Sequence, residues 1–155
     1  MWAWGLGTNG RLGNGSTENQ PLPVQVTGIT DVVYITAGTD NMFAIRKDGS
    51  LWAWGLNTNG QLGISSTTAT VTDNQTSPQR VRGGESGSTY LEDIVHVSAA
   101  KTHTIALKAN GSVYAWGTNG QGQLGIGYET SYAYPMQVIK GQSVSNTPLD
   151  PLKHS

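Results

Sequence analysis

Residues 110–125 read NGSVYAWGTNGQGQLG, and the same phrase recurs at two other places in the chain. Residues 47–63 read KDGSLWAWGLNTNGQLG, and residues 1–13 read MWAWGLGTNGRLG, a copy that lacks the first turn. Recurrence of one phrase along a chain is the sequence signature of a repeat architecture. The sequence therefore predicts an array of similar structural units.

Each complete phrase predicts a β-hairpin. Asp48-Gly49 and Asn110-Gly111 lie between runs of alternating residues, and such dipeptides favour a two-residue turn in which both residues take positive φ. The strand that follows carries aromatic residues on one face and Leu or Val, Ala and Gly on the other. Both faces are apolar or small, so we expect a sheet that is covered on both sides. The glycines that end the phrase, including Gly63 and Gly125, should permit a tight reversal of the loop.

A second repeated unit supplies two further strands. Residues 33–46 align without gaps to residues 95–108, 62 positions further on. A fourth strand is predicted to open with proline in each repeat, at residues 23–26, 78–81 and 135–138, and proline at the start of a strand suits an outer edge. One repeat is thus expected to be a four-stranded antiparallel sheet, the unit of a β-propeller blade.

The predicted fold is all-β, a partial β-propeller that forms one domain over residues 1–155. We expect a half blade at residues 1–26, complete blades at 33–81 and 94–138, and an irregular tail at 139–155. An open array leaves strand edges and apolar blade faces uncovered. Two interpretations follow: a segment of a longer propeller, or a structural subunit that self-assembles into a ring or filament through its open blade ends.

Composition narrows the classes of partner. The formal net charge is -1 and the pI is near 6.2, so no basic field favours nucleic acid or a membrane surface. No run is long and apolar enough to cross a membrane. The chain has no cysteine, which excludes disulfides and thiolate metal sites. Only 12% of residues are charged, and this low value is typical of a turn-rich β protein.

Residues 95–138 resemble the regulator of chromosome condensation repeat. The shared pattern is an inner strand, a small-residue pair, the histidine at His103, Ala-Leu, an Asn-Gly or Asp-Gly turn, a strand ending in Trp-Gly, Gly-Gln-Leu-Gly and Pro-x-x-Val. The resemblance covers about residues 1–138, and it departs at Asn41, which stands where the family has the histidine. Family members resemble seven-bladed rings, and the resemblance implies a structural hydrogen-bonding role for His103.

The tryptophans recur at fixed positions of the repeat. Trp54 and Trp116 precede the last glycine of their strands, and Trp2, Trp4 and Trp52 occupy matching positions. Their recurrence favours packing in the core of the repeats rather than a light-sensing cluster. Trp54, Trp116, Gly63, Gly125 and His103 are therefore interpreted as structural positions of the repeat.

Catalysis has little support in the sequence. No carboxylate or second histidine stands at ligand spacing from His103. Asp40-Asn41 and Asp73-Asn74 lack the full register of a calcium loop, and the Gly-rich phrase lacks the Lys-Ser/Thr of a phosphate loop. We predict no catalytic residue, cofactor or metal, and no enzymatic activity; hydrolase or lyase activity would need a cluster of carboxylates or histidines around the propeller axis.

Binding is expected on loops that the blades hold in place. Residues 64–77 and 82–93 are insertions, and the second contains Glu85 and Glu92; Tyr128, Tyr132 and Tyr134 cluster in the third repeat. Each set also has an interpretation without partner binding. The insertions can be surface loops that the fold tolerates, and the tyrosines can pack on the neighbouring blade. These five residues are the candidate partner-binding positions.

The leading hypothesis is a non-enzymatic protein-interaction or scaffold module, with a protein partner of unknown identity. The family resemblance implies precedents in guanine-nucleotide exchange with chromatin binding, ultraviolet-B perception and β-lactamase inhibition. A homo-oligomer is the alternative, and nucleic-acid binding and membrane insertion are not expected. The low charge and the Thr, Asn and Gly content resemble those of bacterial secreted or cell-surface members of this repeat family.

Overall fold

The computed structural model describes residues 1–66, 70–84 and 89–141. These residues form ten β-strands and one short 3-10 helix. In chain order the elements are β1 (Trp2–Gly5), η1 (Thr8–Gly10), β2 (Gln20–Gln25), β3 (Val32–Ala37), β4 (Asn41–Arg46), β5 (Leu51–Gly55), β6 (Gln75–Arg80), β7 (Ile94–Ala99), β8 (His103–Lys108), β9 (Val113–Gly117) and β10 (Tyr132–Gln137).

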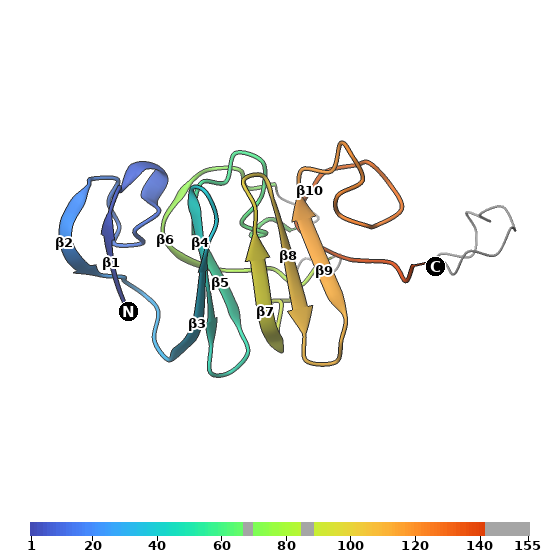
Figure 1. Ribbon diagram of the computed structural model, residues 1–155, viewed down its shortest axis with the longest axis horizontal. Helices are drawn as coiled ribbons and strands as arrows, with labels where there is room; N and C mark the ends of the chain where they lie inside the picture. The colour runs from blue at the N-terminus through green and yellow to red at the C-terminus, as the bar shows by residue number, and fades with distance from the viewer. Residues whose placement is uncertain (67–69, 85–88, 142–155) are drawn as a thin grey trace, which may run out of the picture.

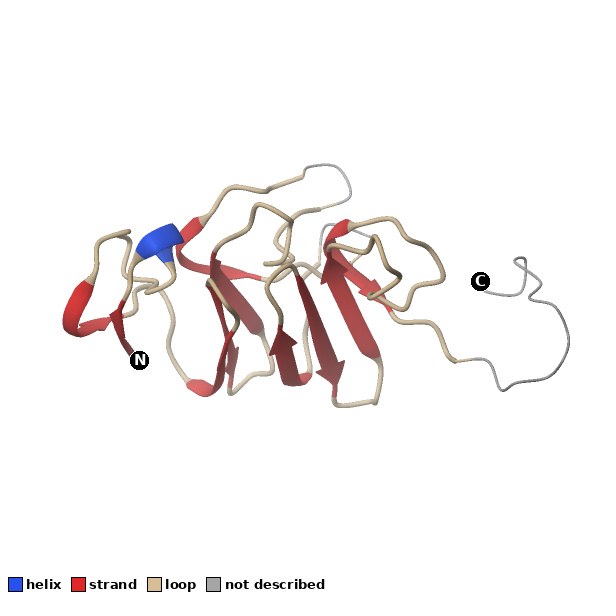
Figure 2. Cartoon of the chain, turned by 45° about the horizontal axis from the view of Figure 1, so that its top comes forward, coloured by secondary structure: helices blue, strands red, loops and turns tan. Residues whose placement is uncertain are grey.

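The strands form three antiparallel sheets that stand side by side along the long axis of the molecule (Figure 1). The first sheet pairs β1 with β2, and the other two have the orders β3-β4-β5-β6 and β7-β8-β9-β10. The turned view shows the same row of sheets (Figure 2). The predicted all-β fold with four-stranded antiparallel blades is confirmed. We call the three sheets the half blade, the middle blade and the last blade.

We keep residues 1–26, 33–81 and 94–138 as the proposed limits of these three units. Residues 142–155, most of the predicted tail, lie outside the described part of the chain.

The middle and last blades share one strand register. Tyr34 of β3 lies opposite Ile45 of β4, and His96 of β7 lies opposite Leu107 of β8. In both pairs an irregularity separates the first residue of the inner strand from the rest. The gap-free alignment of these segments in the sequence therefore corresponds to equal backbone pairing.

The hairpin turn differs from the predicted two-residue type. Gly49 has φ +80°, whereas Asp48 is not among the described residues with positive φ. The Gly49 N–H donates to the Arg46 carbonyl at 2.9 Å, and the Arg46 N–H donates to the Ser50 carbonyl at 3.0 Å. This is the three-residue loop that places one glycine in the left-handed region. The prediction was wrong because the Asp48 side chain, by accepting from Ser50, supports a turn that needs only one positive φ.

The prolines of the outer strands also lie elsewhere than predicted. Strands β2, β6 and β10 begin three residues before Pro23, Pro78 and Pro135, so the prolines stand inside the strands. Each strand is the outermost of its sheet, and each pairing has a register irregularity near its middle. Proline is tolerated there because an outer edge and a bulge do not require its missing N–H.

The hydrophobic core lies between the sheets. The main cluster joins residues of the middle blade, such as Phe43 and Leu62, to Val97 and Trp116 of the last blade. A smaller cluster joins Val26 of the half-blade segment to the middle blade. No helix in the described part of the chain is long and apolar enough to cross a membrane.

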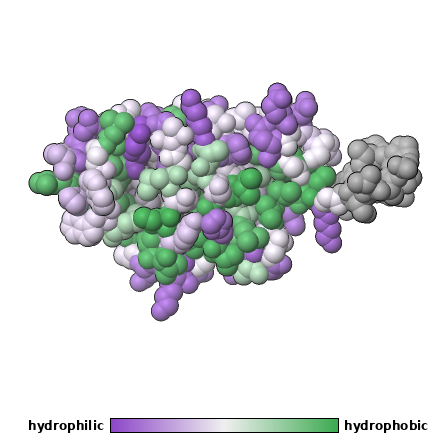
Figure 3. Space-filling view, in the orientation of Figure 1, coloured by the Kyte–Doolittle hydropathy of each residue, from purple (hydrophilic) through white to green (hydrophobic). Residues whose placement is uncertain are grey.

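Some apolar side chains of the inner strands remain exposed. Val33 and Ile35 on β3 are 65% and 52% exposed, and Val95 on β7 is 52% exposed. The space-filling view shows apolar residues gathered over this part of the surface (Figure 3). The side of the array that carries β3 and β7 is therefore less polar than its loops.

Candidate partner-binding surface

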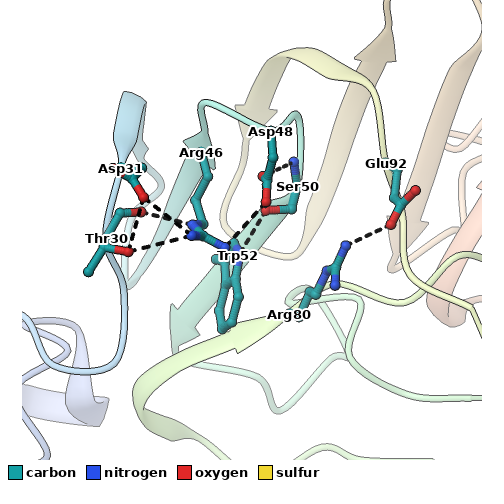
Figure 4. A network of polar contacts seen from close by, with 8 residues as sticks. All are labelled: Thr30, Asp31, Arg46, Asp48, Ser50, Trp52, Arg80 and Glu92. Carbon is teal, nitrogen blue, oxygen red and sulfur yellow. Dashed lines mark hydrogen bonds and ion pairs between the residues drawn. The ribbon is translucent and has the colours of Figure 1, made fainter.

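One end of the middle blade carries a polar network around Arg46 (Figure 4). The Arg46 Nε donates to the Thr30 carbonyl at 2.8 Å. Its Nη atoms lie 3.6 Å from Asp31 Oδ2 and 3.3 Å from Asp48 Oδ2. The guanidinium also lies over the Trp52 ring, 5.9 Å from its centroid. These contacts fix a guanidinium that is only partly buried.

The Asp48 carboxylate is stabilised by the turn that contains it. The Ser50 Oγ and N–H donate to Asp48 Oδ1 at 2.6 and 3.0 Å, and Trp52 Nε1 donates to Ser50 Oγ at 3.0 Å. The side-chain bond from Ser50, then its backbone bond, lower the pKa of Asp48 from its ordinary value of 3.8, and the charge of Arg46 adds to this. Asp48 is therefore ionised at neutral pH.

A second group lies beside this network and consists of Arg80, Arg82, Tyr90 and Glu92, which we call the Tyr90 cluster. The guanidinium carbons of Arg80 and Arg82 lie 4.5 and 5.0 Å from the Tyr90 ring centroid. The Arg80 Nη2 donates to Glu92 Oε1 at 2.7 Å. A β-bridge pairs Arg82 with Tyr90 and so brings the two sides of the β6–β7 connection together.

The Tyr90 cluster has the chemistry of an interaction hot spot. Tyr90 is 40% exposed and the Glu92 side chain is 60% exposed. The buried Arg80 Nε has no hydrogen-bond partner among the described residues. Tyrosine and arginine are enriched at hot spots of protein interfaces, and the contacts to Arg80 and Arg82 order the ring before any partner arrives.

Sequence reasoning found part of this cluster. Glu92 is a predicted binding residue and belongs to it, whereas Glu85 lies outside the described residues. Arg80 and Tyr90 were missed. A signal for Arg80 exists, because Gln25 and Gln137 occupy its position in the other two repeats.

Two of the three predicted tyrosines lie together on one strand, and the third lies in the loop before it. Tyr132 and Tyr134 lie on β10 with their rings 5.4 Å apart in an edge-on arrangement. Tyr132 packs on the apolar cluster of the last blade. Tyr128 is 65% exposed, and its carbonyl accepts from Asn119 Nδ2 at 2.5 Å. Their role in partner binding stays a prediction.

Trp54 and Trp116 join neighbouring sheets. The Trp54 Nε1 donates to the Arg11 carbonyl at 3.0 Å, and the Trp116 Nε1 donates to the Gln61 carbonyl at 2.8 Å. Each carbonyl belongs to the Gly-x-Leu-Gly loop of the preceding repeat. Both indoles are buried. We call this contact the tryptophan lock.

The last glycine of the loop gives the indole its space. A Cβ at Gly63 would lie 2.6 Å from Trp116 Nε1, closer than two such atoms can approach. A Cβ at Gly125, the matching position of the last blade, would meet only Val138 within 4 Å. Gly63 thus lines an occupied lock, whereas no residue of the described structure occupies the space at Gly125.

The expectation of core packing is wrong for Trp2 and Trp4. They are 62% and 65% exposed, although they match Trp52 and Trp54 in the phrase. Trp54, the counterpart of Trp4, is buried against the loop of the repeat before it, and no described repeat precedes β1.

His103 lies partly buried on β8 opposite Gly117. Among the described residues no group of three or more His, Asp or Glu could hold a metal ion. Its hydrogen-bonding role stays a prediction.

The sequence model of the regulator of chromosome condensation (RCC1) repeat matches residues 1–45, 48–107 and 110–148, and a second model of this repeat matches 32–61 and 94–123. The ultraviolet-B receptor UVR8 of Arabidopsis thaliana is 31% identical over 160 residues, which cover 97% of this chain and 34% of the receptor. The human E3 ubiquitin-protein ligase HERC2 is 28% identical over 149 residues, 94% of this chain and 3% of the ligase.

Solved structures agree with these matches. Prp20p of Saccharomyces cerevisiae superposes with a TM-score of 0.68 at 25% identity, over 90% of this chain and 36% of Prp20p. Human WBSCR16 gives a TM-score of 0.70 over 88% of this chain and 34% of its own, and at 21% identity it shows the fold alone. The chain thus spans about a third of the solved propellers that it matches. Together, the three matched repeats and the shared blade structure show that the chain belongs to the RCC1 repeat family.

Proposed function

We propose that this chain is a non-enzymatic interaction module, a segment of an RCC1-like propeller that binds a protein partner through the Tyr90 cluster. The observation that carries the proposal is the ordered, half-exposed Tyr90 ring between two arginines, with Glu92 beside it. Aromatic and arginine side chains held in one conformation lose little entropy on binding. Charges of both signs at this place favour a partner surface with mixed charge.

The relatives support a protein partner. The structure of Prp20p is described together with its binding to Gsp1p and to histones. Those partners belong to Prp20p, and we use them here as probes. The net charge of -1 on this chain supplies no basic field for nucleic acid, so both probes are proteins.

The test places a photo-crosslinking phenylalanine at Tyr90 and, as a matched control, at Tyr128, which is exposed on the last blade. Both variants are irradiated with Gsp1p, with histones and with extract from cells that make the protein. We expect a protein that crosslinks at position 90 and not at 128. Equal crosslinking at the two positions, or none at 90, would overturn the proposal.

The partner identified by crosslinking is then purified, and its affinity for this chain is measured. Tyr90→Ala should weaken binding roughly thirtyfold, because truncation of a hot-spot residue costs about 2 kcal/mol or more. Tyr128→Ala should leave the affinity unchanged.

A second candidate function is assembly of copies of the chain, and one observation favours it. Trp2 and Trp4 are exposed at one end of the array, and Ile105 and Leu107 are 38% and 37% exposed at the other. Apolar residues grouped at the two ends of a repeat array are typical of surfaces that stack on further repeats. Light scattering coupled to size exclusion, over a concentration series, tests whether copies associate.

A further inference from the structure

The two ends of the array carry the two halves of a tryptophan lock. The exposed Trp4 of β1 matches Trp54 and Trp116, which donate to a carbonyl of the preceding repeat. The loop at Gln123 matches the loops at Arg11 and Gln61, which supply those carbonyls. Among the described residues, the chain therefore presents a donor without its loop and a loop without its donor.

The acceptor loop of the last blade has the conformation of an occupied loop. Gly122 and Gly125 have φ +69° and +63°, and their counterparts Gly60 and Gly63 both have φ +69°. The hydrogen bond across each loop, from the last glycine to the first, measures 3.1 Å in both blades. The loop is thus preformed, and only Val138 of the described residues lies within 4 Å of where a Cβ at Gly125 would stand, which leaves room for an indole in this part of the structure.

The donor strand is also preformed. Gly5 after Trp4 has φ +99°, and Gly55 after Trp54 has φ +100°. Ala3 pairs with Val24 of the outer strand, as Ala53 pairs with Gln79 in the middle blade. The backbone around Trp4 therefore matches that of a tryptophan already engaged in a lock.

The surface beside the open loop fits an aromatic ring. In the middle blade Phe43 is fully buried, and its ring centroid lies 6.3 Å from that of Trp116. Ile105 holds the Phe43 position in the last blade and is 38% exposed. An indole at Gly125 would cover this isoleucine as Trp116 covers Phe43.

We propose that a second copy of the chain docks on the last blade, so that Trp4 of one copy enters the Gln123–Gly125 loop of the next and donates its indole N–H to the Gln123 carbonyl. The proposal rests on the assembly function and names its contact. It continues along the array an interface that the chain already forms twice between its own sheets. The contact is head-to-tail, so it leads to a ring if the rotation closes and to a filament if it does not.

The half blade limits the strength of this contact between copies. The half blade offers only the strand pair β1-β2, whereas within one chain the middle and last blades pack together as two four-stranded sheets. We therefore expect association that depends on concentration, with a larger fraction of monomer on dilution.

The first test compares the mass of the wild type with that of Trp4→Ala, Trp4→Phe and the control Tyr90→Ala over one concentration series. Trp4→Ala should raise the concentration for half-association at least about thirtyfold, since a buried hot-spot indole contributes about 2 kcal/mol or more. Trp4→Phe keeps a ring without the donor and should raise it about tenfold or less. Tyr90→Ala, which alters the partner cluster, should not change it.

The second test uses the absence of cysteine in the chain. Trp2→Cys, which keeps Trp4 and lies on the same face of β1, and Ile105→Cys are made as separate proteins, mixed and treated with a short bis-maleimide. We expect crosslinked dimer from the mixture, and little from either protein alone or from Trp2→Cys mixed with Asp48→Cys on the middle blade.

The outcomes separate the two ideas. A monomer at every concentration overturns both the assembly function and the named contact. An oligomer that Trp4→Ala leaves intact, or as much dimer from Trp2→Cys alone as from the mixture, overturns the named contact and leaves assembly standing. None of these results bears on partner binding through the Tyr90 cluster.

Discussion

Trp4 and Trp54 occupy the same position of the same phrase, yet 65% of Trp4 is exposed and only 1% of Trp54. Both lie in a strand that ends in a glycine with φ near +100°. The difference lies in the neighbouring sheet, since the Arg11 loop covers Trp54 and no described repeat covers Trp4.

The comparison shows that burial in a repeat array belongs to pairs of repeats. Stability in such arrays is approximately a sum of repeat terms and nearest-neighbour interface terms. A tryptophan at the lock position therefore contributes to stability only where the preceding loop is present. Substitutions at matched positions of different repeats can separate the interface term from the repeat term.

The largest effect is expected for Trp116→Ala. This indole is fully buried and donates to the Gln61 carbonyl. Its loss leaves a cavity and removes one of the two hydrogen bonds to that carbonyl, which also accepts from Thr104 Oγ1 at 2.8 Å. We expect the free energy of unfolding to fall by about 3–5 kcal/mol, whereas Trp4→Ala should change it by about 0.5 kcal/mol or less. Urea unfolding at a concentration where the chain is monomeric measures both. Equal losses for the two variants would show that burial of the lock tryptophan does not depend on its neighbour.

A smaller effect is expected for alanine at the last glycine of the loop. Gly63→Ala should cost about 2–5 kcal/mol, because a left-handed alanine costs about 1–2 kcal/mol and the crowding against Trp116 adds about 1–3 kcal/mol. Gly125→Ala carries the same backbone cost, but its nearest neighbour is Val138 at 3.1 Å. We expect it to cost about 1–2 kcal/mol.

Thermal unfolding of these two variants isolates the crowding. If Gly125→Ala destabilises as much as Gly63→Ala, the cost is set by the backbone and the indole plays no part. The same Gly125→Ala variant should also weaken association of copies, because its methyl group would occupy the open space of the loop.

The features that sequence could predict are those fixed by local rules. Turn dipeptides and the alternation in β4 and β8 each depend on a few adjacent residues, and the same short patterns recur 62 residues further on. Together these patterns predicted the observed strands. The exposure of Trp2 and Trp4 could not be read in this way, because their own strand is regular and their burial depends on a neighbouring repeat, of which none is described before β1.

The candidate site shows the same limit. Glu92 was found as a charged residue in an insertion, whereas Tyr90 depends on contacts with Arg80 and Arg82 across a β-bridge. A bridge outside the regular strands has no periodic signal. Besides Glu92, the sequence carries one further trace of the cluster, the departure of Arg80 from the glutamines of the other repeats.

The smallest effect is expected at the hairpin turns, where Asp48 and Asn110 hold the same position in two blades. Each accepts the backbone N–H two residues on, at 3.0 Å from Ser50 and 2.9 Å from Ser112. Asp48→Asn keeps this backbone bond and should therefore lower stability at neutral pH only slightly, through loss of the charged carboxylate.

The two turns should differ in acid. Bonds from Ser50 lower the pKa of Asp48 below its ordinary value of 3.8 in the folded chain. The unfolded chain then binds more protons at this residue between the two pKa values, so the stabilisation is present above pH 3.8 and is lost as the pH falls through the folded pKa. Asp48→Asn removes this dependence, as Asn110 already does in the last blade. Urea midpoints measured from pH 5 to about pH 2.5 should fall less steeply for Asp48→Asn than for the wild type; identical slopes would mean that the Ser50 bonds do not favour the charged carboxylate.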